Sequence, residues 1–390
     1  MSATRTVPSS TAPPRPAGAD RPRLWTRGFA LAIVAGCGSS ISFYLLFSAV
    51  PLYAASDGGG VGAGLATGAM MLTTVAAELA TPRLLARYGY RLVFAASLVL
   101  LGVPALALAV WGGMAAVLVA CLVRGVGFGI AVVLGGVLVA LAVPEERRGE
   151  GIGVYGVICG IPSLIALPLG VWVADAAGFP LVFAAGGVAA LAGLAAVRGL
   201  PGRPPDPEPS MGVAAALRGG TLVRPSIVFA ATTVAAGVVA TFLPLAVAGA
   251  AWALLAQSAT TTVTRWWAGR HGDRHGHARL LMPGLLVSAA GMIALALASG
   301  PAAVVAAMVL FGAGFGIVQN ASMAVMLTGV PSSSYGAVTA LWSVAYDAGL
   351  GAGALAFGAV AVHTGYPAGF GLTGLLMLIS LVTRFGKVRK

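Results

Sequence analysis

Three ionisable residues lie inside long apolar runs of the sequence. Arg124 and Asp347 lie well inside two such runs, and Glu78 lies near the end of a third. Charged groups in an apolar environment are costly, so they are candidates for function. A carboxyl group there can take up and release a proton, and a guanidinium can bind an anion or tune a carboxyl group. A fixed ion pair or a packing role is the alternative for Arg124 and Asp347, and the sequence does not show whether the two touch.

Several uncharged polar residues also interrupt the apolar runs. Gln319 and Asn320 are adjacent, whereas Tyr44 and Thr233 lie in two other runs. One interpretation is that these four residues line a cavity. The other is that they form hydrogen bonds between helices, which are common for Ser and Thr in membrane proteins.

No pattern in the sequence is typical of a catalytic, metal or cofactor site. A Ser-His-Asp set and a phosphate-binding loop are missing, and the His-rich segment 271–277 lies among arginines that oppose a cation. We therefore expect no enzyme, no metal and no cofactor. The acidic residues of 145–150 leave one alternative, an integral-membrane enzyme acting on lipids, but Arg147 and Arg148 favour a solvated loop there.

The elements that position these residues must be membrane-spanning helices. Hydrophobic residues make up 58% of the chain and charged residues 9%, which is too little polar surface for a soluble particle. A spanning helix needs about 20 apolar residues. The sequence therefore predicts an all-α integral membrane protein with twelve spans, which lie near 27–55, 61–82, 92–111, 115–143, 150–174, 179–198, 225–247, 250–268, 279–299, 301–329, 335–362 and 366–385.

The positive charge lies almost entirely on one side of these spans. Of the 23 Lys and Arg, 22 fall in the tails and the loops of that side, where we place Arg265 and Arg270, and the remaining one is Arg124. This asymmetry predicts an inner or plasma membrane protein with both termini in the cytoplasm. The net charge of +12 lies in short loops without interleaved aromatic residues. Anionic lipid headgroups are therefore the expected partner, and nucleic acid is not.

A proline-rich stretch divides the chain between the sixth and seventh spans. The predicted parts are a disordered cytoplasmic tail (1–24), a six-helix bundle (25–198), a cytoplasmic linker (199–224), a second six-helix bundle (225–385) and a basic cytoplasmic tail (386–390).

The two bundles repeat each other at an offset of 187 residues. Arg87 and Gly89 match Arg274 and Gly276, and the glycine-rich segment 125–130 matches 312–317. Such an offset predicts two parallel repeats related by an axis along the membrane normal.

The loop between the second and third span of each half carries a known signature. The segment from Gly269 to Gly276 has the form G-x-x-x-D-R-x-G, and the first half has a degraded copy with Ala86 in place of Asp. In this signature the chain resembles the major facilitator superfamily of secondary transporters over residues 25–385. The resemblance implies alternating access, a cavity lined by spans 1, 4, 7 and 10, and a gate and loop motif made of Glu78, Arg83, Arg87, Gly89, Arg91, Gly269, Asp273, Arg274 and Gly276.

The resemblance and the composition together give a functional hypothesis. A glycine-rich fifth span and few charges in the spans favour proton-coupled efflux of small amphipathic compounds by an antiporter, with the proton gradient as energy source. Proton symport that imports a small metabolite is the alternative. We expect a monomer in which Arg124 and Asp347 serve proton coupling or substrate binding. For Glu78 we expect a gate role, in which it docks at residues 332–334 when the inner side closes, and proton coupling through its carboxyl group is the alternative.

Overall fold

The computed structural model describes residues 25–143, 148–200, 222–328, 330 and 335–380. The predicted tails, most of the predicted linker and residues 332–334 lie outside these ranges. Every regular element in the described ranges is a helix, so the all-α prediction is confirmed.

Six spans form the first half of the molecule. The first and second spans are joined into one element at Gly59, whose φ of 56° breaks the helix. The elements of this half are α1 (Arg27–Tyr88), α2 (Tyr90–Leu108), α3 (Met114–Ala142), α4 (Arg148–Ala177), α5 (Phe179–Ala192) and its short continuation α6 (Leu194–Val197).

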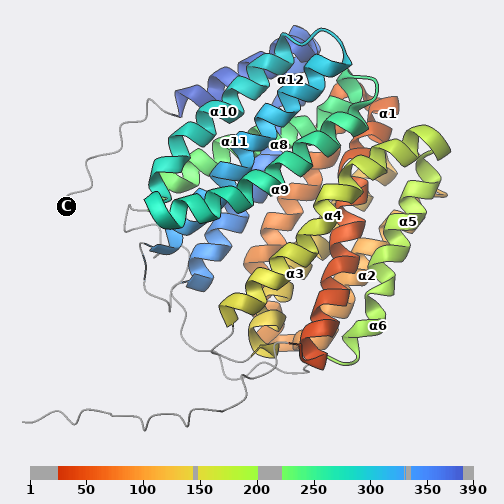
Figure 1. The fold of residues 1–390 in the computed structure, drawn as a ribbon. Helices are drawn as coiled ribbons and strands as arrows, with labels where there is room; N and C mark the ends of the chain where they lie inside the picture. The colour runs from red at the N-terminus through yellow and green to blue at the C-terminus, as the bar shows by residue number, and fades with distance from the viewer. Residues whose placement is uncertain (1–24, 144–147, 201–221, 329, 331–334, 381–390) are drawn as a thin grey trace, which may run out of the picture.

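The second half has the same construction. Its last two spans are joined at Gly365, where φ is 75°. The elements are α8 (Val223–Ala246), α9 (Ala250–His275), α10 (Ala278–Ala296), α11 (Pro301–Thr328) and α12 (Tyr335–Ile379). The helices from α1 to α6 gather on one side of the molecule, and those from α8 to α12 gather on the other (Figure 1).

Length and composition support the twelve predicted spans. Within the described ranges, nine helices are long and apolar enough to cross a membrane, and two of these, α1 and α12, each contain two spans. These nine helices supply eleven spans. The twelfth span is α9, which is 26 residues long but is not among the nine because it contains more polar residues.

Loop glycines repeat at the predicted offset. Gly89 and Gly276 have φ values of 74° and 93°, and two further pairs with positive φ, 113 with 300 and 178 with 365, are also 187 residues apart. Only glycine adopts such angles without strain. The two halves therefore share their helix ends as well as their helices.

The same helix contacts also occur in both halves. Thr74 Oγ1 donates a hydrogen bond to the carbonyl of Gly125 over 3.2 Å, and Thr261 Oγ1 donates one to Gly312 over 3.1 Å. Both bonds join the second helix of a half to its fourth. The glycines allow this because a side chain at either position would collide with the facing backbone. The structure thus supports two parallel repeats.

The two halves meet where α1 lies against α12. A Cβ atom on Gly64 would lie 2.6 Å from the carbonyl oxygen of Ala354, and one on Gly358 would lie 2.9 Å from that of Gly60. Thr67 and Thr241 are hydrogen-bonded across the halves at 3.0 Å. This contact, which we call the small-residue seam, lies at the end of the molecule where Gly59 is found.

Candidate functional site

Glu78 and Asp347 come together where the two halves meet. Glu78 lies on α1 and Asp347 on α12, and their carboxyl groups interact with each other. Both side chains are buried, with 6% and 3% exposed. Within the described ranges neither carboxylate oxygen of Glu78 accepts a hydrogen bond. The predicted docking of Glu78 at residues 332–334 concerns residues outside the described ranges and stays a prediction.

Arg124 is not part of this carboxyl pair. Its side chain is fully buried, and its guanidinium donates to the carbonyls of Leu101 (2.8 Å, Nη1) and Ser42 (3.1 Å, Nη2). These bonds join α3 to α2 and α1, all within the first half. Among the described residues no ion pair links Arg124 to Asp347, so the question left by the sequence is answered for this conformation.

Sequence analysis missed Arg265 as a site residue. We counted it with the loop arginines although it lies within the predicted span 250–268, and the structure places it inside α9, ten residues before the last residue of that helix. Its Nη1 donates to Oε1 of Gln319 over 3.4 Å. Tyr44 and Tyr346 lie within electrostatic range of the guanidinium. The repeat offset could have identified Arg265 as a site residue, because it lies 187 residues after Glu78 and so occupies the equivalent position in the second half.

The uncharged candidates divide into two groups. Gln319 binds Arg265, and Tyr44 is half-buried on α1 with its ring 4.9 Å from that of Phe43. Thr233 instead donates to the carbonyls of Ala230 (3.0 Å) and Ala345 (3.3 Å), which fits the alternative of a hydrogen bond between helices. Asn320 lies beside Gly269 near the end of α9, away from the carboxyl pair.

An aromatic cluster lies beside the polar groups in the second half. Trp342 stacks on Phe229 with ring centroids 4.4 Å apart, and on Tyr346 at 5.8 Å. Phe315 lies 6.4 Å from Tyr346. The rings come from α8, α11 and α12, and they form an apolar wall next to the residue that precedes Asp347.

The predicted gate and loop residues lie at the ends of α1 and α9. Gly89 and Gly276 end these helices, and their N–H groups donate to Leu85 (2.9 Å) and Gly272 (2.7 Å). Asp273 Oδ1 lies 3.1 Å from Nε2 of His277. The remaining members are Arg83 and Arg274, which are exposed, Arg87, whose guanidinium lies over the ring of Tyr88, Arg91, whose Nε donates to the carbonyl of Leu200, and Gly269.

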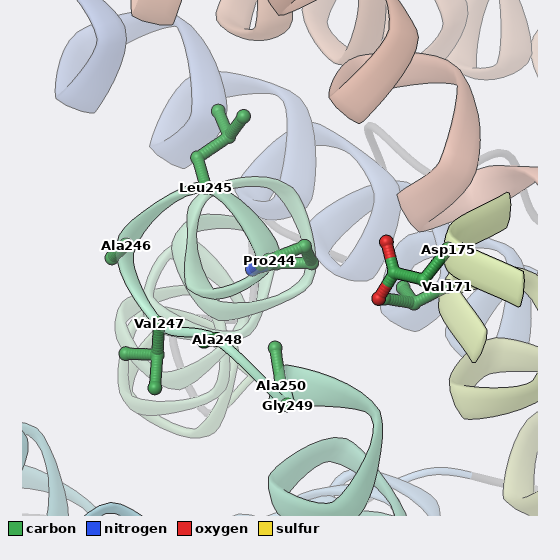
Figure 2. A pocket seen from close by; sticks show the side chains of 9 residues that line it. All are labelled: Val171, Asp175, Pro244, Leu245, Ala246, Val247, Ala248, Gly249 and Ala250. Carbon is green, nitrogen blue, oxygen red and sulfur yellow. The ribbon is translucent and has the colours of Figure 1, made fainter. Parts of the chain in front are cut away.

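A cavity of about 330 Å³ lies at the connection between α8 and α9 (Figure 2). Val171 and Asp175 of α4 line it from the first half, and residues 244–250 line it from the second. Arg265 is 15 residues beyond Ala250, which places it about 22 Å further along α9. The cavity is therefore separate from Arg265.

Solved structures share this fold over almost the whole chain. The xylose transporter XylE from E. coli matches with a TM-score of 0.75 and 14% identity, covering 94% of this chain and 100% of that one. A D-xylose-proton symporter matches at 0.74 and 14%, covering 91% and 96%. A variant of the nucleoside transporter NupG matches at 0.69 and 13%, covering 92% and 98%.

The sequence itself matches a family model twice. A search of curated proteins finds no match. The model of the Major Facilitator Superfamily matches residues 32–249 and 226–389, so both halves are covered. This family consists of transporters and not of enzymes, and the fold, the repeat and the paired helix contacts agree with it. The chain is a multi-pass membrane protein that belongs to the Major Facilitator Superfamily.

Proposed function

We propose that this transporter is proton-coupled and that Glu78 and Asp347 together carry the proton. The observation that supports this most directly is the position of the two carboxyl groups, which are buried against each other between α1 and α12. The pair joins the two halves, and these halves must move relative to each other in alternating access. Proton binding at this position therefore acts on the contact that opens and closes.

The physical reason is the cost of unpaired charge. Two carboxylates that are close together and buried repel each other, and each is costly to remove from water. A shared proton removes one charge and allows a hydrogen bond between the groups. Release of the proton turns the contact into a repulsive one, which favours separation of α1 from α12.

Efflux of small amphipathic compounds in exchange for protons is our first candidate for substrate and direction. The glycine-rich segment of α4 and the apolar lining expected for the cavity support it. An amphipathic compound that is neutral or cationic would replace the proton at the carboxyl pair.

Import by proton symport is the second candidate. The sequence favoured export because few polar or charged groups were expected inside the spans. Arg265 and Gln319 are such groups inside α9 and α11, so their position favours import. One protein of the same fold is named a D-xylose-proton symporter, so the fold is compatible with proton symport.

Transport into proteoliposomes under an imposed pH gradient tests coupling and direction together. Wild type, Asp347→Asn and Glu78→Gln are compared with Arg265→Gln, using an amphipathic dye and both gradient polarities. We expect gradient-driven movement to be lost in both carboxyl variants while exchange at equal pH persists. Gradient-driven movement that survives in both variants would contradict the assignment. The polarity that drives accumulation distinguishes export from import.

We also propose an orientation and a setting in the membrane. Arg83, Arg87, Arg270 and Arg274 are exposed near the ends of α1 and α9 and would face anionic headgroups on the cytoplasmic side of the cell membrane. Both tails would be cytoplasmic and the protein would be a monomer. Labelling of single cysteines placed at residue 87 and at residue 363 in intact cells tests the orientation, because only the second should react with an impermeant reagent.

A further inference from the structure

We propose that Arg265 and Gln319, with the hydroxyl groups of Tyr44 and Tyr346, form a subsite for an anionic group of the substrate. The substrate would then be a carboxylate or sulfonate on an apolar or aromatic body. This inference rests on the proposed proton-coupled transport and specifies its substrate class.

Arg265 has no acidic partner in the described part of the chain. Its hydrogen bond there is the long one to Gln319, at 3.4 Å, and the salt bridge found in the described ranges joins His277 and Asp273. A guanidinium has five N–H donors in a planar fork that suits a carboxylate. The Arg265 side chain is exposed, so solvent reaches the guanidinium, and a bound anion would supply the counter-ion that the described part of the chain does not.

The side chain of Arg265 is on the inward side of α9. Arg265 follows Thr261 by one helical turn, and Thr261 bonds to Gly312 of α11, so both residues lie on the face that packs against α11. Val263, Trp266 and Trp267 are exposed at 63%, 61% and 44% on the other side. The side chain of Arg265 is itself exposed, as is its hydrogen bond to Gln319, so solvent and solutes reach its charge on the side of α9 that faces α11.

Arg270 provides a contrast on the same helix. Its guanidinium lies over the ring of Trp266, 4.4 Å from the centroid, on the exposed face of α9. That arrangement suits the membrane interface, where Trp and Arg anchor helices. Both arginines are exposed, but Arg265 is hydrogen-bonded to Gln319 of α11, whereas Arg270 lies over Trp266 of its own helix.

The wall beside Arg265 suits an apolar body. Tyr346 lies within electrostatic range of the guanidinium and stacks with Trp342, which in turn stacks with Phe229. An aromatic or alkyl group can pack against such rings while its anionic end binds the arginine. A compound with both parts is amphipathic, and its anionic end distinguishes it from the neutral or cationic compounds of the export candidate.

The anion subsite and the carboxyl pair are distinct but close. Tyr44 lies within electrostatic range of both Arg265 and Asp347. The carboxyl group that interacts with Asp347 is that of Glu78. An anion at Arg265 adds negative charge near the pair, which favours the protonated form of the pair. Proton and anion therefore bind together, as in a symporter, and the subsite strengthens the import candidate.

Ligand binding to the purified full-length protein in detergent tests the subsite without a gradient. The probes are 4-phenylbutyrate, its neutral amide and 4-phenylbutylamine, measured by calorimetry. We expect wild type to bind the anion at least tenfold more tightly than the amide or the amine. Arg265→Gln should remove that preference, Arg265→Lys should retain part of it, and the matched control Arg270→Gln should leave it unchanged.

Several results would overturn the subsite. These are equal binding of the three probes by wild type, binding of none of them, or a preference that persists in Arg265→Gln. If Arg265→Gln does not yield a monodisperse protein, Gln319→Leu replaces it, with an expected loss of about threefold in anion affinity. Failure of the proposed function is distinguishable, because gradient-driven transport could fail while the anion preference and its loss in Arg265→Gln are still observed.

Discussion

The two halves of this transporter share a scaffold but differ in their charged residues. Thr74 and Thr261 occupy equivalent positions and make the same hydrogen bond to a glycine carbonyl. One turn later on the same helices, the first half has Glu78 and the second has Arg265. At this place the repeat has therefore kept the helix contact and changed the charged residue one turn later.

Two further equivalent pairs show the same division. Arg124, which bonds to carbonyls of two neighbouring helices, corresponds to Phe311, which packs in the apolar core. Asp347 corresponds to Gly160, where no heavy atom would meet an added side chain. A transporter that moves two different species needs different sites, and the positions where the halves differ are where such sites can arise.

Replacing Glu78 by the residue of the second half should have the largest effect. In Glu78→Arg a guanidinium would face Asp347 and form a buried ion pair that no longer needs a proton. We expect gradient-driven transport to fall at least about tenfold while exchange at equal pH persists, because the adjacent guanidinium keeps Asp347 ionised and leaves no shared proton to carry. Proteoliposome transport with and without a pH gradient measures this. Full gradient dependence in the variant would show that the pair does not carry the proton.

Arg124→Met tests the second unequal pair through stability. Two carbonyls in the core would lose their donor, so we expect the free energy of unfolding to fall by about 2–4 kcal/mol, about 1–2 kcal/mol for each carbonyl. Phe311→Leu at the equivalent position keeps an apolar group and should cost less than about 1.5 kcal/mol. Equilibrium unfolding in mixed micelles gives both values. Equal losses would remove the structural distinction between these positions.

The shared scaffold predicts equal effects at equivalent glycines. A Cβ on Gly127 would lie 2.6 Å from the carbonyl oxygen of Ser97, and Gly314 faces the backbone of Gly284 and Ser288 in the same way. We expect Gly127→Ala and Gly314→Ala to destabilise by about 1–3 kcal/mol each. Gly136→Ala is the matched control on α3, because nothing lies within 4 Å of its added atom. If thermal unfolding showed that Gly136→Ala loses as much stability as Gly127→Ala and Gly314→Ala, the packing argument would be refuted.

The smallest expected effect is at the paired threonines. Thr74→Val and Thr261→Val each remove one hydrogen bond between helices and keep the side-chain shape. Such bonds in membrane proteins contribute about 0.6 kcal/mol on average, so both losses should be of that size. Unfolding measured side by side for the two variants and the double variant would show two equal, additive losses. A difference above about 1 kcal/mol between the two losses would mean that the two hydrogen bonds contribute unequally although their geometry is alike.

Much of the fold could be predicted because it depends on local composition. Apolar runs and the 187-residue offset predict the spans and the repeat, and glycines with positive φ mark the loops of both halves. Arg265 was misassigned because a rule based on charge counts assigns arginines to loops, although the predicted span 250–268 contains it. The pairing of Glu78 with Asp347 depends on how two distant helices meet, which the pattern along the chain does not contain.

The small-residue seam has a consequence for the speed of the transport cycle. Near Gly64 and Gly358 the halves touch through backbone and small side chains, and in the described ranges the side-chain hydrogen bond that crosses between them there is that of Thr67 with Thr241. Opening such a surface breaks short-range dispersion contacts and does not require ions to be rehydrated. The opening rate at this end should therefore respond to temperature and bilayer composition and hardly at all to salt, whereas acidity would act through the proposed proton site at the distant carboxyl pair.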